Sequence, residues 1–177
     1  MKVLFLDFDG VINTYWWNAD GTKIDIGYKD KCTNFQAVQW ISHFCTKYDY
    51  KIVVTSTWRI HSTVEQLRQV LYNSGLSKKV EVLDKTECLP HDHITRGEEI
   101  YLWLKSHPGV ENYIIVDDDD DFEYTPYMRD HFIKTNFYDG FKTTDFFAME
   151  HMHKQLFKEM AQNGAGVYIR NDSSCGQ

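Results

Sequence analysis

The sequence has few of the features that mark disulfide-rich, membrane-spanning or strongly basic proteins. Its 177 residues include four cysteines, none in a C-x-x-C pair, so we expect neither a disulfide framework nor a paired-cysteine metal site. The chain contains no candidate membrane span and opens directly into an apolar run instead of a signal peptide. We therefore expect a cytoplasmic protein with no membrane partner, and nothing in the sequence indicates an obligate protein partner.

Positive charge is also scarce. The chain carries 19 Lys and Arg against 26 Asp and Glu, which gives a formal net charge of −7. This balance argues against broad binding along a nucleic-acid backbone, although it does not exclude contact with one nucleic-acid end. The length suits one domain, which we place at residues 1–161, followed by a loose tail at 162–177.

The most informative stretch is the beginning of the chain, where an apolar run ends at two carboxylates. Residues 2–8 are rich in Val, Leu and Phe, which is typical of a strand buried on both faces of a parallel sheet. Asp7 then lies at its carboxyl end, where open α/β sheets bind ligands. Gly10 permits a sharp turn, so Asp7 and Asp9 can present oxygens to one point beside backbone N–H groups. Two anions this close indicate a cation.

A second apolar run repeats this pattern far downstream. Residues 113–117 read as a buried strand, and they lead into five consecutive aspartates, Asp117 to Asp121. If the two strands are neighbours, Asp7, Asp9 and one or two of the later aspartates converge. Such an all-oxygen site favours Mg²⁺ over Zn²⁺.

Hydroxyls and a cation complete the set of candidate groups. The run 51–56 ends in Thr55 and Ser56, and either hydroxyl can donate to a phosphoryl oxygen. Further along, Thr95 can cap a helix and Arg96 falls in its first turn, where acidic residues are usual. A cation at that place suggests an anionic ligand.

Strand and helix patterns alternate through the chain, which predicts an α/β fold with a parallel sheet and right-handed crossovers. Residues 14–30 read as a β-hairpin flap, and no insertion is long enough for a cap domain. We expect strands near 2–8, 51–56, 80–84, 113–117 and 131–135, and helices near 31–48, 62–74, 97–106 and 143–161.

In this order, the four motifs resemble those of the haloacid dehalogenase (HAD) superfamily of phosphotransferases: Asp-x-Asp-Gly, a strand-ending Ser or Thr, a Lys or Arg, and an acidic pair. The resemblance spans residues 3–121 and is closest to small capless members with Thr-Ser-x-Trp-Arg after the second strand, a group linked to RNA-repair phosphatase domains and phage-type enzymes. It implies a Rossmann-like, doubly wound parallel sheet in strand order 3-2-1-4-5, with Mg²⁺ as cofactor.

The resemblance also implies roles for the acidic residues. Asp7 would be the nucleophile that forms an aspartyl-phosphate, and Asp9 the general acid and base. Asp7, the Asp9 backbone carbonyl and a carboxylate from Asp117 or Asp118 would ligate Mg²⁺. We favour Asp118, because the acidic ligand of the family usually takes the second place after the strand.

The remaining candidates would contact the phosphate or the rest of the substrate. Thr55 or Ser56 would bind the phosphoryl group, a choice the sequence leaves open, and Arg96 would offset its charge and orient Asp7. Our candidate substrate contacts are Gly10, Trp58, Arg59, Trp16 and Trp17. Each aromatic residue has packing as its alternative role, and so has Arg59.

The expected function is therefore a Mg²⁺-dependent phosphatase that acts on a phosphomonoester, with a nucleotide or polynucleotide end as the leading substrate class. A small phosphometabolite is the alternative within the same reaction class. A phospho-accepting receiver or metal-binding module is the alternative from another class, and the Asp9-Gly10 pair and the order of Thr55 and Arg96 weigh against it.

Overall fold

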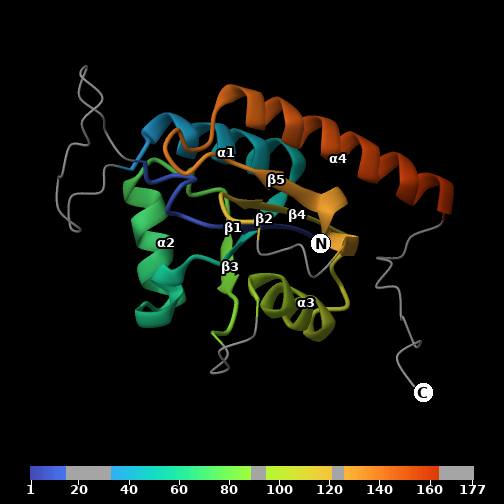
Figure 1. Cartoon of the computed structure of the whole chain (residues 1–177), viewed down its shortest axis with the longest axis horizontal. Coiled ribbons are helices and arrows are strands. Elements are labelled where there is room, and N and C mark those ends of the chain that lie inside the picture. The colour runs from blue at the N-terminus through green and yellow to red at the C-terminus, as the bar shows by residue number, and fades with distance from the viewer. Residues whose placement is uncertain (15–32, 89–94, 121–125, 164–177) are drawn as a thin grey trace.

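A five-stranded parallel sheet forms the centre of the molecule, as Figure 1 shows. The structure, a computed structural model, describes residues 1–14, 33–88, 95–120 and 126–163. The strand order is β3-β2-β1-β4-β5, which confirms the predicted topology and the α/β fold class. The strands are β1 (Lys2–Leu6), β2 (Tyr50–Val54), β3 (Val82–Lys85), β4 (Asn112–Asp117) and β5 (Phe132–Lys134).

Helices cover both faces of this sheet, with α1 and α4 on one side and α3 on the other (Figure 1). They are α1 (Phe35–Tyr48), α2 (Val64–Asn73), α3 (Arg96–Ser106) and α4 (Thr143–Asn163), with two 3-10 helices, η1 (Thr57–His61) and η3 (Pro126–His131). Side chains cap the starts of the first three α-helices, because Asn34, Thr63 and Thr95 accept hydrogen bonds from N–H groups of the first turn. Thr95 thus caps α3 as predicted, and Arg96 is the first residue of that helix.

The central strand β1 is buried on both faces, which explains its continuous apolar sequence. Leu4 and Leu6 belong to the core that α1, α2 and α4 cover. Val3 and Phe5 point the other way, into the core beside α3. All four side chains have 0% exposure, so packing on both faces fixes the position of β1 and of the residues at its carboxyl end.

The register of the sheet brings the candidate residues into one row. Leu6 pairs with Val54 of β2 and with Val116 of β4. The backbone N–H of Asp7 donates to the Val116 carbonyl, and the N–H of Thr55 donates to the Leu6 carbonyl, each at 3.0 Å. Asp7, Thr55 and Asp117 therefore lie side by side at the carboxyl edge.

The main differences from the predicted boundaries lie at the strand ends. β1 stops at Leu6, because the Phe8 carbonyl turns to accept the N–H groups of residues 11, 12 and 13. Helix η1 was not predicted, and it begins where the Ser56 side chain accepts the Trp58 N–H. Helix α4 ends at Asn163, so residues 162 and 163 of the predicted tail are helical.

Two predicted segments fall largely outside the described residues: the flap at 14–30, beyond residue 14, and the tail from residue 164. The domain limits of 1–161 stay a prediction. Among the helices that the structure describes, none combines the length and the apolar character needed to cross a bilayer.

Candidate active site

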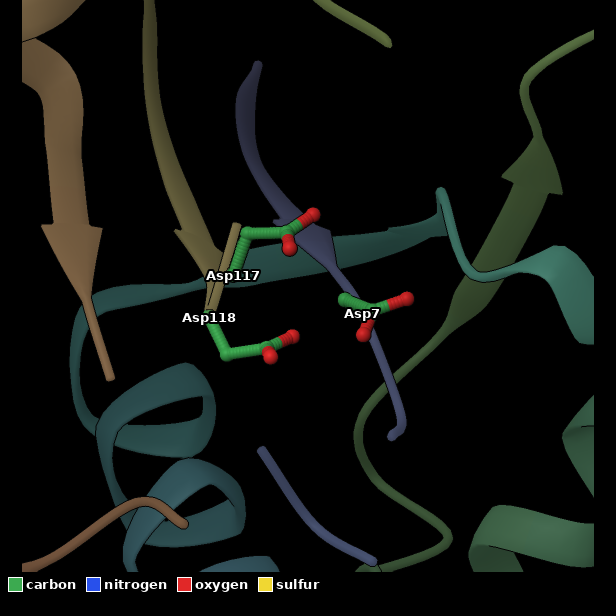
Figure 2. A group of neighbouring side chains, drawn as sticks. All are labelled: Asp7, Asp117 and Asp118. Atoms are coloured by element: carbon green, nitrogen blue, oxygen red, sulfur yellow. The ribbon is translucent and has the colours of Figure 1, made fainter. Parts of the chain in front are cut away.

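Three carboxylates converge at the carboxyl edge of β1 and β4, as Figure 2 shows. Asp7, Asp117 and Asp118 each offer an oxygen, and these oxygens lie within 4.8 Å of one another. Asp7 is 4% exposed and Asp117 is fully buried. The predicted convergence of the two acidic strand ends is therefore observed, and this group of three carboxylates could hold a metal ion.

Burial raises the pKa values of all three clustered carboxyl groups. Burial, followed by the charge of Asp117, raises the pKa of Asp7 to about 7, although Arg96 and a hydrogen bond from Ser56 oppose the rise. Burial and the same neighbour raise the pKa of Asp118 to about 6, and burial raises that of Asp117. In the absence of a further positive charge, this grouping favours protonated carboxyls.

Arg96 supplies one positive charge to the cluster from the first turn of α3. Its Nη1 lies 3.3 Å from Oδ1 of Asp7 and 2.5 Å from Oδ2 of Asp117. Burial opposes its ionisation, but the charges of Asp117 and Asp7 outweigh burial, so the pKa of Arg96 is raised and it stays charged. The predicted cation is thus beside the predicted nucleophile.

The two aspartates at the end of β4 have different surroundings. Asp117 is engaged by the protein, because Arg96 binds one of its oxygens and the Asp119 N–H donates to the other at 3.0 Å. Asp118 is about half buried and forms no ion pair with the described residues. Its carboxylate is the more available of the two for a metal ion.

Gly10 makes room for the Asp118 carboxylate. Its φ of +75° lies in the left-handed region, and a Cβ added there would lie 2.4 Å from Cγ of Asp118. The Thr135 hydroxyl donates to the Gly10 carbonyl at 2.7 Å and fixes the turn. We predicted Gly10 as a substrate contact, and the structure gives it a steric role at the acidic cluster.

Asp9 lies two residues beyond Asp7, but its carboxylate is not a member of the cluster. Trp58 Nε1 donates to its Oδ2 at 3.1 Å, and Asn13 Nδ2 donates to its Oδ1 at 3.2 Å. Trp58 and Asn13 thus hold the carboxylate of Asp9 outside the acidic cluster, which is compatible with metal ligation through its backbone carbonyl.

The two candidate hydroxyls also differ. The Ser56 side chain hydrogen-bonds Asp7 and accepts the Trp58 backbone N–H at 3.4 Å. Thr55 Oγ1 is buried and has no hydrogen-bond partner in the part of the chain that the structure describes. Because Thr55 follows in register beside Asp7, its hydroxyl is the one left for a ligand.

Arg59 was predicted to contact the substrate or to pack, and the structure favours packing. It is 4% exposed, donates to the Thr55 carbonyl at 2.5 Å and forms a buried ion pair with Glu99 of α3. A buried charge needs such a partner, so Arg59 ties the residues after β2 to α3. Trp16 and Trp17 lie outside the described residues.

Sequence reasoning missed two residues that hold this site together. Asn13 is 5% exposed, and besides binding Asp9 it accepts a hydrogen bond from Thr33 Oγ1 at 3.1 Å. Glu99 is buried on α3 as the partner of Arg59. Only the spacing of Asn13, four residues after Asp9 in a tight turn, hints at its role in the sequence.

The comparisons with known proteins agree with this geometry. Residues 3–146, most of the chain, match the family described as "HAD domain in Swiss Army Knife RNA repair proteins". No curated protein matches the chain.

Proposed function

Because the chain belongs to the family of HAD domains in Swiss Army Knife RNA repair proteins, we propose that it is a Mg²⁺-dependent phosphomonoester hydrolase that uses an aspartyl-phosphate intermediate. The family indicates a hydrolase of the phosphatase type. The observation that carries the proposal is the contrast between Asp7 and Asp9. Asp7 lies in the acidic cluster beside Arg96, whereas Asp9, in the same turn, accepts hydrogen bonds from Trp58 and Asn13.

The donor set fits a magnesium ion. Asp7, Asp118 and the backbone carbonyl of Asp9 would be the protein ligands, with Asp117 in support, and all offer the hard oxygens that Mg²⁺ prefers. When bound, Mg²⁺ would supply positive charge that offsets the repulsion between the carboxylates and the phosphate. Such a charge would also favour the ionised form of Asp7, whose pKa burial and Asp117 raise.

In the first step, an oxygen of Asp7 attacks phosphorus and the bond from phosphorus to the leaving oxygen breaks. The carboxyl proton of Asp9 moves to that leaving oxygen, so the product leaves as an alcohol. Arg96, 3.3 Å from Asp7, would orient the nucleophile and offset charge on the phosphoryl group. The unpartnered hydroxyl of Thr55 would donate to a phosphoryl oxygen.

In the second step, the Asp9 carboxylate takes a proton from water while the water oxygen attacks phosphorus. The bond from Asp7 to phosphorus breaks, which releases inorganic phosphate and restores both carboxyl groups. Ser56, which hydrogen-bonds Asp7, would keep its carboxylate in place through both steps.

We further propose that the substrate is a nucleotide or the phosphorylated end of a nucleic acid. Support comes from the family description, which places these domains in RNA repair proteins. The net charge of −7 fits contact with one end better than contact along a backbone.

A phosphate-release assay with Mg²⁺ tests both proposals. Substrates would include an aryl phosphate, nucleoside monophosphates, sugar phosphates and oligonucleotides with 3′- or 5′-phosphate ends. We expect repeated turnover, with the highest kcat/KM on a nucleotide or an oligonucleotide end. A single phosphorylation without turnover would indicate a receiver, and preference for sugar phosphates would indicate a metabolite phosphatase.

Asp7→Asn is the matched variant for this assay, because it keeps the side-chain volume and removes the nucleophile. We expect no turnover on any substrate, with the circular dichroism spectrum of the wild type. A near-normal rate in this variant would exclude covalent catalysis by Asp7.

A further inference from the structure

Trp58 and Asn13 hold the two oxygens of the Asp9 carboxyl group, one each. The indole Nε1 of Trp58 donates to Oδ2 at 3.1 Å, and the amide Nδ2 of Asn13 donates to Oδ1 at 3.2 Å. A carboxyl oxygen has room for more than one hydrogen bond or proton, so these two contacts orient the group.

Trp58 is itself fixed in position by its surroundings. Its ring meets the ring of Phe8, which lies between Asp7 and Asp9 in the chain, at 5.8 Å between centroids and 62°. Its backbone N–H donates to Ser56, which also binds Asp7. The indole is therefore packed against the same turn that carries both carboxylates.

Helix η1, which carries Trp58, is also held by hydrogen bonds from β3. Lys85 Nζ, at the end of β3, donates to the carbonyls of Arg59 and Ser62, each at 2.7 Å. Arg59 in turn forms its buried ion pair with Glu99 of α3. Helix η1 thus has little freedom to shift, and the Nε1–H of Trp58 is presented to Asp9 at a defined place.

Asn13 is fixed at three points. Its backbone N–H donates to the Phe8 carbonyl at 2.8 Å, and its own carbonyl accepts the Gly10 N–H at 2.9 Å. Its side-chain oxygen accepts from the Thr33 hydroxyl, which directs the amide N–H₂ toward Asp9. Neither donor to Asp9 is a flexible surface group.

We infer that Trp58 and Asn13 are positioning residues that hold the Asp9 carboxyl group in the orientation needed for proton transfer to the leaving oxygen. This inference rests on the proposed function, because it needs Asp9 as the general acid. It replaces substrate contact as the role of Trp58. A displaced carboxyl group would slow the chemical step most where the leaving oxygen is a poor leaving group, because that step depends most on a well-placed proton.

The test measures kcat and KM of Trp58→Phe on an alkyl phosphate and on an aryl phosphate. This change keeps a ring against Phe8 and removes only the N–H donor. We expect kcat/KM, which reports the first step, to fall by about tenfold on the alkyl phosphate and much less on the aryl phosphate. In an Asp9→Asn background the same change should cost less than about twofold, because Trp58 acts through Asp9.

Trp103→Phe is the matched control. It removes another indole N–H, which donates to Asp84 at 2.7 Å away from the acidic cluster, and it should leave the ratio of alkyl to aryl rates as in the wild type. Asn13→Leu, which removes the other donor, should repeat the pattern of Trp58→Phe, and it decides the question if Trp58→Phe does not fold.

Four results would overturn the inference. A raised KM that persists in the Asp9→Asn background would make Trp58 a substrate contact. Equal losses on both substrates together with a lower Tm would make its role merely structural. If the wild type turns over both substrates and the variants keep its ratio of alkyl to aryl rates, positioning is rejected and the proposed function stands. If the wild type shows no turnover, both are rejected.

Discussion

β1 and β4 are both buried strands with aspartates at their carboxyl ends, yet the structure uses these aspartates differently. At the end of β1 the two carboxylates diverge, Asp7 toward the acidic cluster and Asp9 toward Trp58 and Asn13. At the end of β4 both carboxylates reach the cluster, but Arg96 and a backbone N–H engage Asp117 while Asp118 forms no ion pair in the described chain.

The role of a strand-end carboxylate therefore depends on its donors and not on its position in a motif. Arg96 lies beside Asp7 and Asp117, Trp58 and Asn13 contact Asp9 outside the cluster, and Asp118, without an ion pair among the described residues, is left to a cation. The following predictions test these assignments by changing one of them at a time.

The largest effect is expected where the available carboxylate of β4 is removed. Asp118→Ala should weaken Mg²⁺ binding by roughly 100-fold, because the ion loses a charged ligand that nothing replaces. Isothermal titration with MgCl₂ measures this affinity directly.

Asp120→Ala is the matched control in the same acidic run. Asp120 is exposed and pairs with Lys134 at 2.6 Å, so its loss should barely alter Mg²⁺ affinity. Equal affinities in the two variants would remove Asp118 from the ligand set, and a larger defect in Asp117→Ala would move the ligand by one residue.

A smaller effect is expected from a substitution at Gly10, the steric neighbour of Asp118. In Gly10→Ala the new methyl group would lie within 2.4 Å of the Asp118 carboxylate and would occupy a φ of +75°, which side chains rarely adopt. We expect Mg²⁺ affinity to fall by about tenfold, with a stability loss of about 1 to 2 kcal/mol. Wild-type affinity in this variant would show that Asp118 moves freely.

The smallest effect concerns the stability of the metal-free protein. The pKa of Asp7 is raised from 3.8 to about 7 in the folded state, so the folded state binds more protons than the unfolded state between these values. The free energy of unfolding therefore falls as pH rises through this window. Asp7→Asn removes the contribution of Asp7 to this pH dependence.

Urea denaturation with chelator at pH 4 and at pH 8 tests this prediction. Relative to wild type, Asp7→Asn should gain roughly 1 kcal/mol at the higher pH, less than the full value of the shift because Arg96 loses a partner. A variant that is relatively less stable at pH 8 than at pH 4 would show that Arg96 overcompensates the burial of Asp7.

Much of the fold could be predicted from the sequence. Composition identifies the apolar strands, and their alternation with helices predicts a parallel sheet. The strand order came from the family resemblance, and the meeting of Asp7 with Asp117 and Asp118 follows from that order. The cap at Thr95 has a short-range signal, which is why Arg96 was placed correctly in its helix.

The finer parts of the site could not be predicted, because they depend on contacts between distant segments. The place of Arg59 directly after Thr-Ser-x-Trp suggested a substrate contact. Only the position of Glu99, 40 residues away, shows that Arg59 forms a buried ion pair. Likewise the donor that Trp58 offers to Asp9 across 49 residues has no local pattern.

The central claim is that Asp7 carries the phosphoryl group while Asp9 moves protons, and a trapping measurement on Asp9→Asn tests it most directly. With an aryl phosphate the first step needs little acid, but the second step needs Asp9 as base, so the intermediate should accumulate. Acid quench followed by peptide mass spectrometry should find phosphate on Asp7. Phosphate on another residue, or none on Asp7 while the wild-type protein turns over the same substrate, would contradict the account.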